Sequence, residues 1–385
     1  MAAASRRVVV VGGGVAGLAA ARALHRSGIA AVVLERQVAL ADAGLAVNLP
    51  GNAIRALDGL GLAGELSKKG APVGRREYRN ARGRLLFSVD ETRFWGQEAQ
   101  PRCVRRSDLV TLLQQGLPSE VLRYGCPVTS VRQPAGRGGA GPLTAVLADG
   151  TVEEAGLLVG ADGVRSAVRG QVFGRPAPQA ALLSDSSWRF MTPDPGVGCW
   201  TVWAGSHGAL FLLIPAGHGE AYGWVAAPAH APGDLRGAFS AFPKIVRETL
   251  DAAWAQPVPP YHSPLEEVRV PAWSKGRSVL IGDAAHATAP VWAQGAALAI
   301  EDAQVLAELL ASGDDWDRAG PEYERRRRPR VEHVVAATDR LSRMAGLPGL
   351  LRDLLMPLAG PRSYRAAYQP LRAPAAGAYD SWGSR

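Results

Sequence analysis

Three glycines near the start of the chain have the spacing that binding of a dinucleotide requires. Gly12, Gly14 and Gly17 form a G-x-G-x-x-G pattern. Gly12 would permit a tight turn, Gly14 would let the backbone approach a pyrophosphate, and Gly17 would allow a helix to pack closely on a strand. Glu35 follows the glycines at the separation along the sequence that is typical of an acidic residue whose carboxylate accepts hydrogen bonds from a ribose. The pattern predicts a dinucleotide site.

A second acidic residue stands between a predicted strand and a basic helix. Residues 157–160 are apolar and predict a buried strand, and Asp162-Gly163 follows them directly. Asp149-Gly150 has the same two letters, but it lies between two short alternating segments. That pair predicts only a hairpin turn.

A third group of polar residues lies late in the chain. Residues 278–282 predict a short buried strand that delivers Asp283 to the edge of a loop, where a carboxylate suits hydrogen bonding to a polyol chain. Pro290 stiffens this loop, and Gln294-Gly295 open the next helix. The first N–H groups of that helix and its positive dipole end could face an electron-rich or anionic atom.

The elements that must position these residues alternate in type along the chain. Residues 8–11 and 31–34 predict buried parallel strands with a helix between them, and residues 52–59, 107–115, 239–254, 296–310 and 320–358 predict further helices, with Ser107 as an N-cap. Residues 75–79 and 85–89 alternate around a turn and predict a hairpin. Residues 128–132 and 143–147 predict strands, and 136–142 predict a flexible loop.

This order predicts an α/β fold in which a Rossmann-type domain is interrupted twice by one mostly antiparallel β-sheet. We expect a discontinuous dinucleotide domain, a sheet domain for the substrate and a loose C-terminal tail. The expected boundaries are 1–72, 102–178 and 267–372 for the first, 73–101 and 179–266 for the second, and 373–385 for the tail.

Composition excludes several other classes of protein. The 385 residues carry a formal charge of +8, and the densest basic run is Arg325 to Arg328 with Arg330. No aromatic residues are interleaved with this run, so we interpret it as a solvated helix face rather than a nucleic-acid site. No apolar run approaches the length of a membrane span. Three cysteines without C-x-x-C spacing favour a reducing cytoplasm and no metal site.

Together the three motifs resemble those of the single-component FAD-dependent aromatic hydroxylases, the para-hydroxybenzoate hydroxylase-like flavoprotein monooxygenases. The resemblance covers roughly residues 5–370 and includes Arg106-x-x-Leu109 as a weaker match. It implies a glutathione reductase-like FAD domain, resident non-covalent FAD, and NAD(P)H as a transient co-substrate. The residues implied to contact or surround the cofactors are Gly12, Gly14, Ala16, Gly17, Glu35, Arg36, Arg106, Val128, Asp162, Asp283, Pro290, Gln294, Gly295 and Ala296.

The chain departs from the family pattern at a few positions near the flavin. Ala293 precedes Gln294-Gly295 where many relatives have glycine, and Ala46 stands where a glycine is common. Trp292 is bulky on the expected substrate side. These departures concern the shape of the substrate pocket rather than the binding of FAD.

The resemblance implies transfer of one oxygen atom from O2, through a flavin C4a-hydroperoxide, to an electron-rich aromatic molecule. Pro290 and Arg189 are the candidate catalytic positions, where Arg189 would hold a substrate anion or steady the flavin. We interpret His286 as structural and His207, His218, His230 and His262 as ordinary surface or core residues. Most tryptophans of the inserted sheet would be core, and the candidates for the pocket are Trp188, Trp203, Trp224 and Trp292.

Other interpretations of the same fold remain open at this point. They are an epoxidase, a Baeyer–Villiger oxygenase, a halogenase, a flavin reductase or dehydrogenase, and a non-catalytic FAD-binding carrier. A halogenase is disfavoured because Trp200-Thr201-Val202-Trp203 is not followed by Ile-Pro. We expect a monomer or homodimer.

Overall fold

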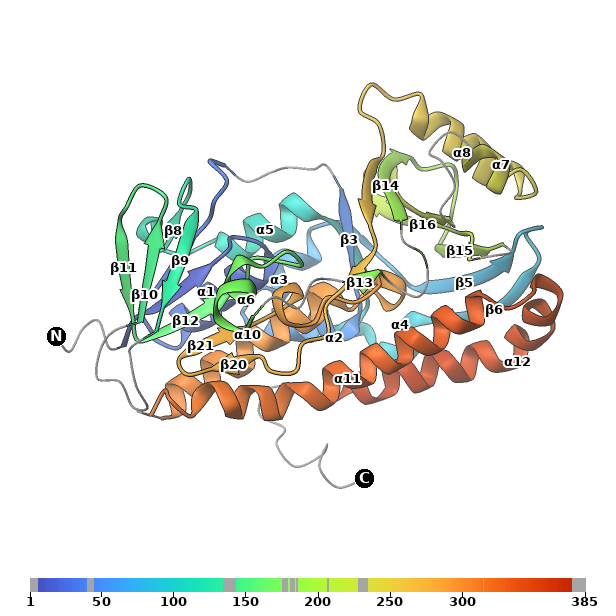
Figure 1. Ribbon diagram of the computed structural model, residues 1–385. Helices are drawn as coiled ribbons and strands as arrows, with labels where there is room; N and C mark the ends of the chain where they lie inside the picture. Colours follow the sequence, from blue (N-terminus) through green and yellow to red (C-terminus); the bar gives the residue numbers. More distant parts are fainter. Residues whose placement is uncertain are drawn as a thin grey trace.

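The main sheet of the computed structural model brings the three motifs to one edge. The structure describes residues 6–39, 45–133, 143–174, 179–180, 184, 186–205, 208–227, 235–313 and 315–375. Six strands of this part form a sheet in the order β20-β21-β12-β1-β2-β8 (Figure 1). Their bounds are Ser274–Lys275, Ser278–Leu280, Leu157–Gly160, Val8–Val11, Ala31–Leu34 and Leu122–Arg123.

The central strands of this sheet are parallel. β1 pairs with β12 on one side and with β2 on the other, and β12 pairs with β21. The four valines of β1 are buried, as expected for a strand covered on both faces. Because parallel strands end at the same edge, the residues that follow β1, β2, β12 and β21 are neighbours there. These residues are Gly12, Glu35, Asp162 and Asp283.

Helices from both halves of the chain cover this sheet. α1 (Val15–Arg26) packs against α10 (Gly295–Ser312), and α10 in turn packs against α2 (Gly51–Gly59) and α11 (Ala319–Ala345). Smaller elements complete the layer around the sheet. They are α3 (Ala63–Ser67), α5 (Arg106–Gln114), α6 (Ala167–Val172), α9 (Asp283–His286), and the strands β3 (Ala46–Leu49), β4 (Ala71–Pro72), β7 (Arg102–Arg105), β9 (Val128–Arg132), β10 (Leu143–Leu147) and β11 (Val152–Ala155).

The second large sheet has two differently used faces. Its seven described strands lie in the order β18-β14-β17-β16-β15-β5-β6, and all pairs are antiparallel except β15 with β5. One face packs against α8 (Lys244–Trp254), and the other faces the main sheet domain (Figure 1). The strand bounds are Tyr261–Pro264, Ser186–Pro193, Glu220–Ala227, Leu210–Gly217, Trp200–Ala204, Arg75–Asn80 and Leu85–Asp90; the remaining short elements are α4 (Glu91–Trp95), α7 (Leu235–Ala238), β13 (Gln179–Ala180) and β19 (Glu266–Glu267).

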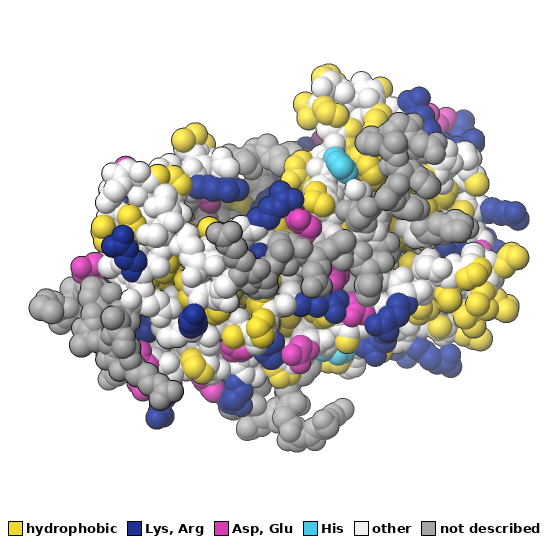
Figure 2. Space-filling model, viewed as in Figure 1, with side chains coloured by type: hydrophobic (Ala, Val, Ile, Leu, Met, Phe, Trp, Pro, Cys, Tyr) yellow, Lys and Arg dark blue, Asp and Glu magenta, His cyan; other side chains and the backbone are white. Residues whose placement is uncertain are grey.

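Two long C-terminal helices run along the molecule and join the sheets. α11 lies beside α10, and α12 (Gly349–Tyr368) lies beside β6 at the far end of the second sheet (Figure 1). Hydrophobic side chains gather on the surface at that end, with basic side chains beside them (Figure 2). Among the described residues, no helix has the length and apolar character needed to cross a bilayer.

Two local predictions were wrong. α5 begins at Arg106, one residue before Ser107, and no side chain caps it. Residues 239–254 do not form one helix, because α8 starts only at Lys244 after Pro243, whose ring nitrogen cannot donate a hydrogen bond. Gly44, His207, His230, the loop at 136–142 and most of the tail at 373–385 lie outside the described residues.

Candidate active site

The three motif glycines meet different surroundings. Gly12 has φ +107°, and a Cβ there would lie 2.5 Å from the carbonyl oxygen of Ala161. A Cβ on Gly17 would lie 1.8 Å from the Gly12 carbonyl oxygen, so this glycine is needed for packing. A Cβ on Gly14 would meet no atom within 4 Å. The space in front of Gly14 is therefore open to a ligand, at the start of a helix that no side chain caps.

Glu35 is fixed at this edge by the backbone. Its carboxylate accepts hydrogen bonds from the N–H of Gly13 at 2.6 Å and from the N–H of Gln37 at 2.9 Å. Each carboxylate oxygen keeps a second lone pair, so Glu35 can still accept from ribose hydroxyls. Arg36 and Arg106 are exposed, and Val128 is half-buried at the start of β9.

Asp162 has a structural function that its sequence context did not indicate. Its carboxylate accepts hydrogen bonds from the hydroxyl of Ser166 and from the N–H groups of Ala167 and Val168, at 2.7 and 3.1 Å. It thus satisfies the first N–H groups of α6. The backbone of Asp162 packs against Gly12, since a Cβ on that glycine would lie 2.9 Å from its Cα. Asp162 therefore supports the turn at Gly12 that joins β1 to α1.

The segment around Asp283 contacts the first motif directly. Gly282 has φ +58°, and a Cβ there would lie 2.9 Å from the Cβ of Ala16. Asp283 is exposed at the start of α9, and its Oδ1 would lie 3.8 Å from a Cβ on Gly295. Its carboxylate has no hydrogen-bond partner among the described residues. A free acceptor between two uncapped helix starts fits a ligand that carries both hydroxyl and phosphate groups.

The loop after Asp283 presents its backbone rather than its side chains. Pro290 opens a short 3-10 helix, and Ala293 adopts a left-handed conformation with φ 52°. The amide of Gln294 exchanges hydrogen bonds with the amide of Asn52, at 2.9 and 3.2 Å. α10 starts directly afterwards without a side-chain cap. The N–H groups of Gly295 and Ala296 can therefore face a bound flavin, whereas the Gln294 side chain is already occupied.

A buried ionic network (His286, Glu301, Asp302, Arg327 and Arg330) holds this loop and α10 in place. Asp302 accepts from the Gly282 N–H at 2.9 Å, from His286 Nε2 at 2.6 Å and from Arg327 Nε at 2.7 Å. Arg330 donates two hydrogen bonds to Glu301. Burial alone would raise the pKa of Asp302, but His286 and Arg327 hold it well below its usual range.

This network corrects one interpretation of the sequence. The run Arg325 to Arg328 with Arg330 is not wholly a solvated face, because Arg327 and Arg330 are buried. Their partners, Glu301 and Asp302, lie on α10 after a run of apolar residues. The spacing of charged residues along the chain does not indicate this pairing. His286 is structural, as interpreted, because its ring is buried against Asp302.

The inner face of the second sheet lies against the Pro290 loop. Trp224 packs in one cluster with Ala289, and Val291 packs on the same cluster. Arg189 is the cross-strand partner of Trp224, so both side chains lie on this face. Arg189 is half-buried and has no carboxylate partner among the described residues. The Nε1 of Trp224 is also buried, and no described residue accepts a hydrogen bond from it.

Tyr222 completes this group of donors. Burial raises its pKa to about 12, and the charge of Arg189 opposes the shift. The phenol is therefore protonated at neutral pH and can donate a hydrogen bond. Arg189, Tyr222 and Trp224 together offer hydrogen-bond donors on the face that lies against the loop, beside the apolar side chains of the same cluster.

The other predicted pocket residues lie elsewhere. Trp188 and Trp203 belong to the cluster that packs against α8, on the outer face of the sheet. Trp292 is buried in the main core, where its ring packs edge-on against Tyr368 at 5.4 Å. Of the four tryptophans, the structure brings only Trp224 to the sheet face beside Ala289 and Val291.

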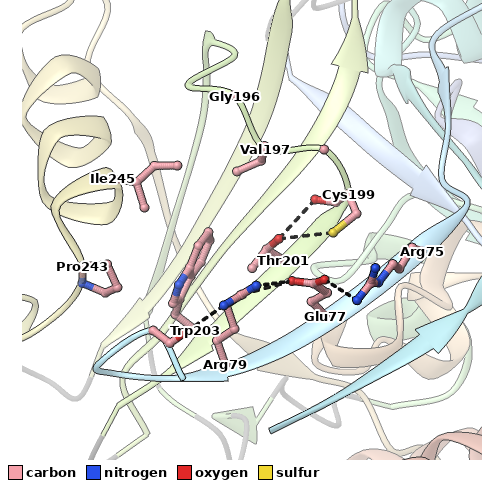
Figure 3. A pocket seen from close by; sticks show the side chains of 12 residues that line it. Arg75, Glu77, Arg79, Gly196, Val197, Cys199, Thr201, Trp203, Pro243 and Ile245 are labelled. Carbon is pink, nitrogen blue, oxygen red and sulfur yellow. Dashed lines mark hydrogen bonds and ion pairs between the residues drawn. The ribbon is translucent and has the colours of Figure 1, made fainter. Parts of the chain in front are cut away.

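A cavity of about 490 Å³ also lies on the outer face, between β5, β15 and α8 (Figure 3). Trp203 and Ile245 line it, together with Glu77, which forms ion pairs with Arg75 and Arg79 at 2.8 and 2.7 Å. The sheet separates this cavity from the Pro290 loop. We therefore assign the candidate active site to the inner face, which lies against the Pro290 loop.

Comparisons with known proteins agree with this geometry. Residues 5–338 match the FAD binding domain family. The chain is 33% identical over 384 residues to 3-amino-4-hydroxybenzoate 2-monooxygenase PtmB3 of Streptomyces platensis. The alignment covers 92% of this chain and 93% of that protein. It is 30% identical over 357 residues to 6-hydroxynicotinate 3-monooxygenase of Pseudomonas fluorescens, covering 86% and 89%.

Solved structures show the same architecture. HpxO of Klebsiella pneumoniae, in complex with FAD and uric acid, superposes with a TM-score of 0.79 at 25% identity, covering 95% of this chain and 92% of that one. The 2-methyl-3-hydroxypyridine-5-carboxylic acid oxygenase superposes with a TM-score of 0.77 at 26% identity, covering 96% and 97%.

The chain therefore belongs to the FAD binding domain family and has the fold of the flavin-dependent hydroxylases. It is an FAD-dependent monooxygenase of the type that uses NAD(P)H, which confirms the predictions of fold, enzyme class and cofactors. The open space at Gly14, the free carboxylate of Asp283 and the uncapped start of α10 fit FAD. When bound, FAD supplies the hydride and oxygen chemistry. The protein orients the reactants, provides charged groups and excludes water.

Proposed function

We propose that this monooxygenase hydroxylates a small, electron-rich aromatic molecule that carries an anionic group, and that the substrate binds between the inner face of the second sheet and the Pro290 loop. The half-buried guanidinium of Arg189, which has no carboxylate partner within the described part of the chain, is the observation that supports this proposal most strongly. Even partial burial of a cation is unfavourable without a counter-charge nearby, and a substrate carboxylate or phenolate would supply that charge.

The neighbouring residues suit the same kind of substrate. Trp224 Nε1 and the Tyr222 hydroxyl can donate to oxygen or ring-nitrogen acceptors, while Leu212 and Val291 supply apolar contact. Such walls would exclude water from the reacting oxygen. The two curated relatives named above act on a hydroxybenzoate and a hydroxynicotinate, which are small aromatic acids and so support this class.

We propose the following contacts for FAD. The N–H groups at Gly14 and at the start of α1 would hold the pyrophosphate, with Glu35 on the ribose and Asp283 on the ribityl chain. The backbone of Pro290 to Ala296 would flank the flavin ring. Arg36, Arg106 and Val128 stay predictions as further FAD contacts, and so does the assignment of the two domains by residue range.

Substitution of Arg189 tests the proposal. Arg189→Met should raise KM for an accepted aromatic acid by about 10- to 100-fold, since a charge-assisted hydrogen bond contributes about 1.5–3 kcal/mol. Arg189→Lys should recover part of the loss. NAD(P)H oxidation and the absorbance change of bound FAD would be measured with 4-hydroxybenzoate, 3-amino-4-hydroxybenzoate and 6-hydroxynicotinate as probes.

Arg75→Met is the matched control, because Arg75 lies at the cavity on the outer face. It should leave KM unchanged. A wild-type KM in Arg189→Met, combined with a raised KM in Arg75→Met, would mean that the substrate binds on the outer face of the sheet. That result would contradict the proposal. The cytoplasmic location and the monomer or homodimer state stay predictions; Cys103, Cys126 and Cys199 are free thiols, which agrees with a reducing compartment.

A further inference from the structure

Helix α12 has two opposite faces of unusual composition. One face is buried and consists of residues four apart: Arg352, Met356, Gly360, Tyr364 and Tyr368. Gly360 fits tightly, because a Cβ there would lie 2.2 Å from the ring of Phe87 in β6. This close packing fixes which way the helix is turned.

The opposite face of α12 carries five exposed leucines, which we call the leucine face: Leu350, Leu351, Leu354, Leu355 and Leu358. Their side chains are 42% to 91% exposed. Residues four apart share one side of a helix, so Leu350, Leu354 and Leu358 form one line and Leu351 and Leu355 form a second. The five exposed leucines between positions 350 and 358 form one contiguous apolar patch, and such patches mark interaction sites. Figure 2 shows hydrophobic side chains gathered at the end of the molecule where Figure 1 places α12.

The charges around the leucine face are mostly positive. Arg362 continues the line of Leu350, Leu354 and Leu358, and Arg365 and Arg343 are exposed nearby on α12 and at the end of α11. The one carboxylate of α12, Asp353, is half-buried and accepts a hydrogen bond from Asn80 at 2.6 Å, and it lies beside Arg84 and Arg352. The exposed excess around the leucines is therefore basic.

We propose that the leucine face docks this enzyme on an anionic lipid bilayer surface, with α12 lying in the plane of the interface. Leucines on one side of a helix with arginines beside them are the features of helices that bind there. Charge decides between a bilayer and a second copy of the chain. Pairing two leucine faces would bring arginines toward arginines, whereas anionic headgroups would neutralise them.

Vesicle flotation with the full-length FAD-loaded protein tests this inference. Vesicles of 70% phosphatidylcholine and 30% phosphatidylglycerol should carry the protein upward, and pure phosphatidylcholine vesicles should carry much less. Leu354→Ser/Leu358→Ser should weaken the partition coefficient by on the order of tenfold or more. Arg362→Gln/Arg365→Gln should weaken it by several-fold per arginine, on the anionic vesicles only.

Val258→Ser is the matched control, since Val258 is 78% exposed and lies outside α12. It should bind as the wild type does. The FAD spectrum and thermal unfolding of each variant verify its fold, because all the substituted side chains are exposed. Equal flotation of the wild type and the leucine variant would overturn the proposal, and so would no flotation of the wild type. Sedimentation velocity covers the remaining case: a dimer that the leucine variant dissociates, without vesicle binding, would make the face a self-association site and overturn the proposal too.

Discussion

Gly14 and Gly17 belong to one motif but serve different ends. Gly17 is packed against the Gly12 carbonyl, so its missing side chain is a requirement of the fold. Gly14 faces open space and has φ −76°, which any residue adopts without strain. Its missing side chain is therefore a requirement of the ligand. The two functions of the motif can be separated by substitution.

Gly14→Ala should fold normally but bind FAD on the order of tenfold or more weakly, because its Cβ would occupy the space proposed for the pyrophosphate. Gly17→Ala should destabilise the FAD-free protein by about 1–3 kcal/mol, since the added carbon clashes with packed backbone. Denaturant unfolding of the FAD-free proteins and fluorescence titration with FAD separate the two effects. Equal loss of stability in both variants would refute the distinction.

At the scale of elements, α12 contacts the loop that is expected to flank the flavin. The hydroxyl of Tyr368 donates to the Trp292 carbonyl oxygen at 2.7 Å and accepts from Arg76 at 3.3 Å. Arg76 is buried, forms an ion pair with Glu91 at 2.7 Å and lies over the ring of Trp200. Tyr368 therefore joins the second sheet, α12 and the Pro290 loop, and we infer that it positions the loop.

Tyr368→Phe should destabilise the protein by about 1–3 kcal/mol, because the Trp292 carbonyl loses its hydrogen bond in a buried place. It should also weaken FAD binding, since Trp292 lies in the loop. Tyr364→Phe is the control, because its hydroxyl donates to Glu91 rather than to the loop. Thermal unfolding and FAD titration of both variants test this. Unchanged FAD affinity in Tyr368→Phe would remove the positioning function.

At the scale of the whole molecule, the buried ionic network joins elements far apart in the chain. Glu301 accepts hydrogen bonds from Asn52 on α2 and from Arg330 on α11, and Asp302 accepts from the Gly282 N–H beside the proposed FAD site. Burial would raise the pKa of Glu301, but Arg330 and Arg327 hold it below its usual value. Two carboxylates with lowered pKa values make folding stability sensitive to acid.

The sign of this effect follows from linkage. A carboxylate with a lowered pKa in the folded state stabilises the protein fully above its unfolded pKa of about 4, and the stabilisation is lost as pH falls through the lower folded value. Asp302→Asn should cost about 3–5 kcal/mol at pH 7, because Arg327 and His286 lose their partner. It should also flatten the decline of stability between about pH 5 and pH 2.

Unfolding by urea at several pH values measures this dependence. Asp315→Asn is the control, because its pairing with Arg318 is exposed and should contribute little. An Asp302→Asn variant as acid-sensitive as the wild type would show that other carboxylates control the acid transition.

The sequence predicts those features whose residues are close together along the chain better than those that depend on contacts between distant elements. The placement of Gly12, Asp162 and Asp283 at one edge of the main sheet is predictable, because each residue lies just after a strand, whereas the capping of α6 by Asp162 is not. The buried pairing of Arg327 and Arg330 is not readable, because their partners lie on another helix. Trp188 and Trp224 look alike in sequence, and only the pairing of β14 with β17 and the position of α8 assign them to opposite faces. The charge of Arg189 becomes informative only once its neighbours among the described residues are known.

Oxygen labelling tests the central claim most directly. The FAD-loaded enzyme would be given NADH or NADPH and an accepted aromatic acid under 18O2. We predict that the nicotinamide reduces the bound FAD and that the product gains one labelled oxygen atom on its ring. Incorporation of oxygen from labelled water instead, or a bound FAD that neither nicotinamide reduces with any aromatic acid present, would contradict the account.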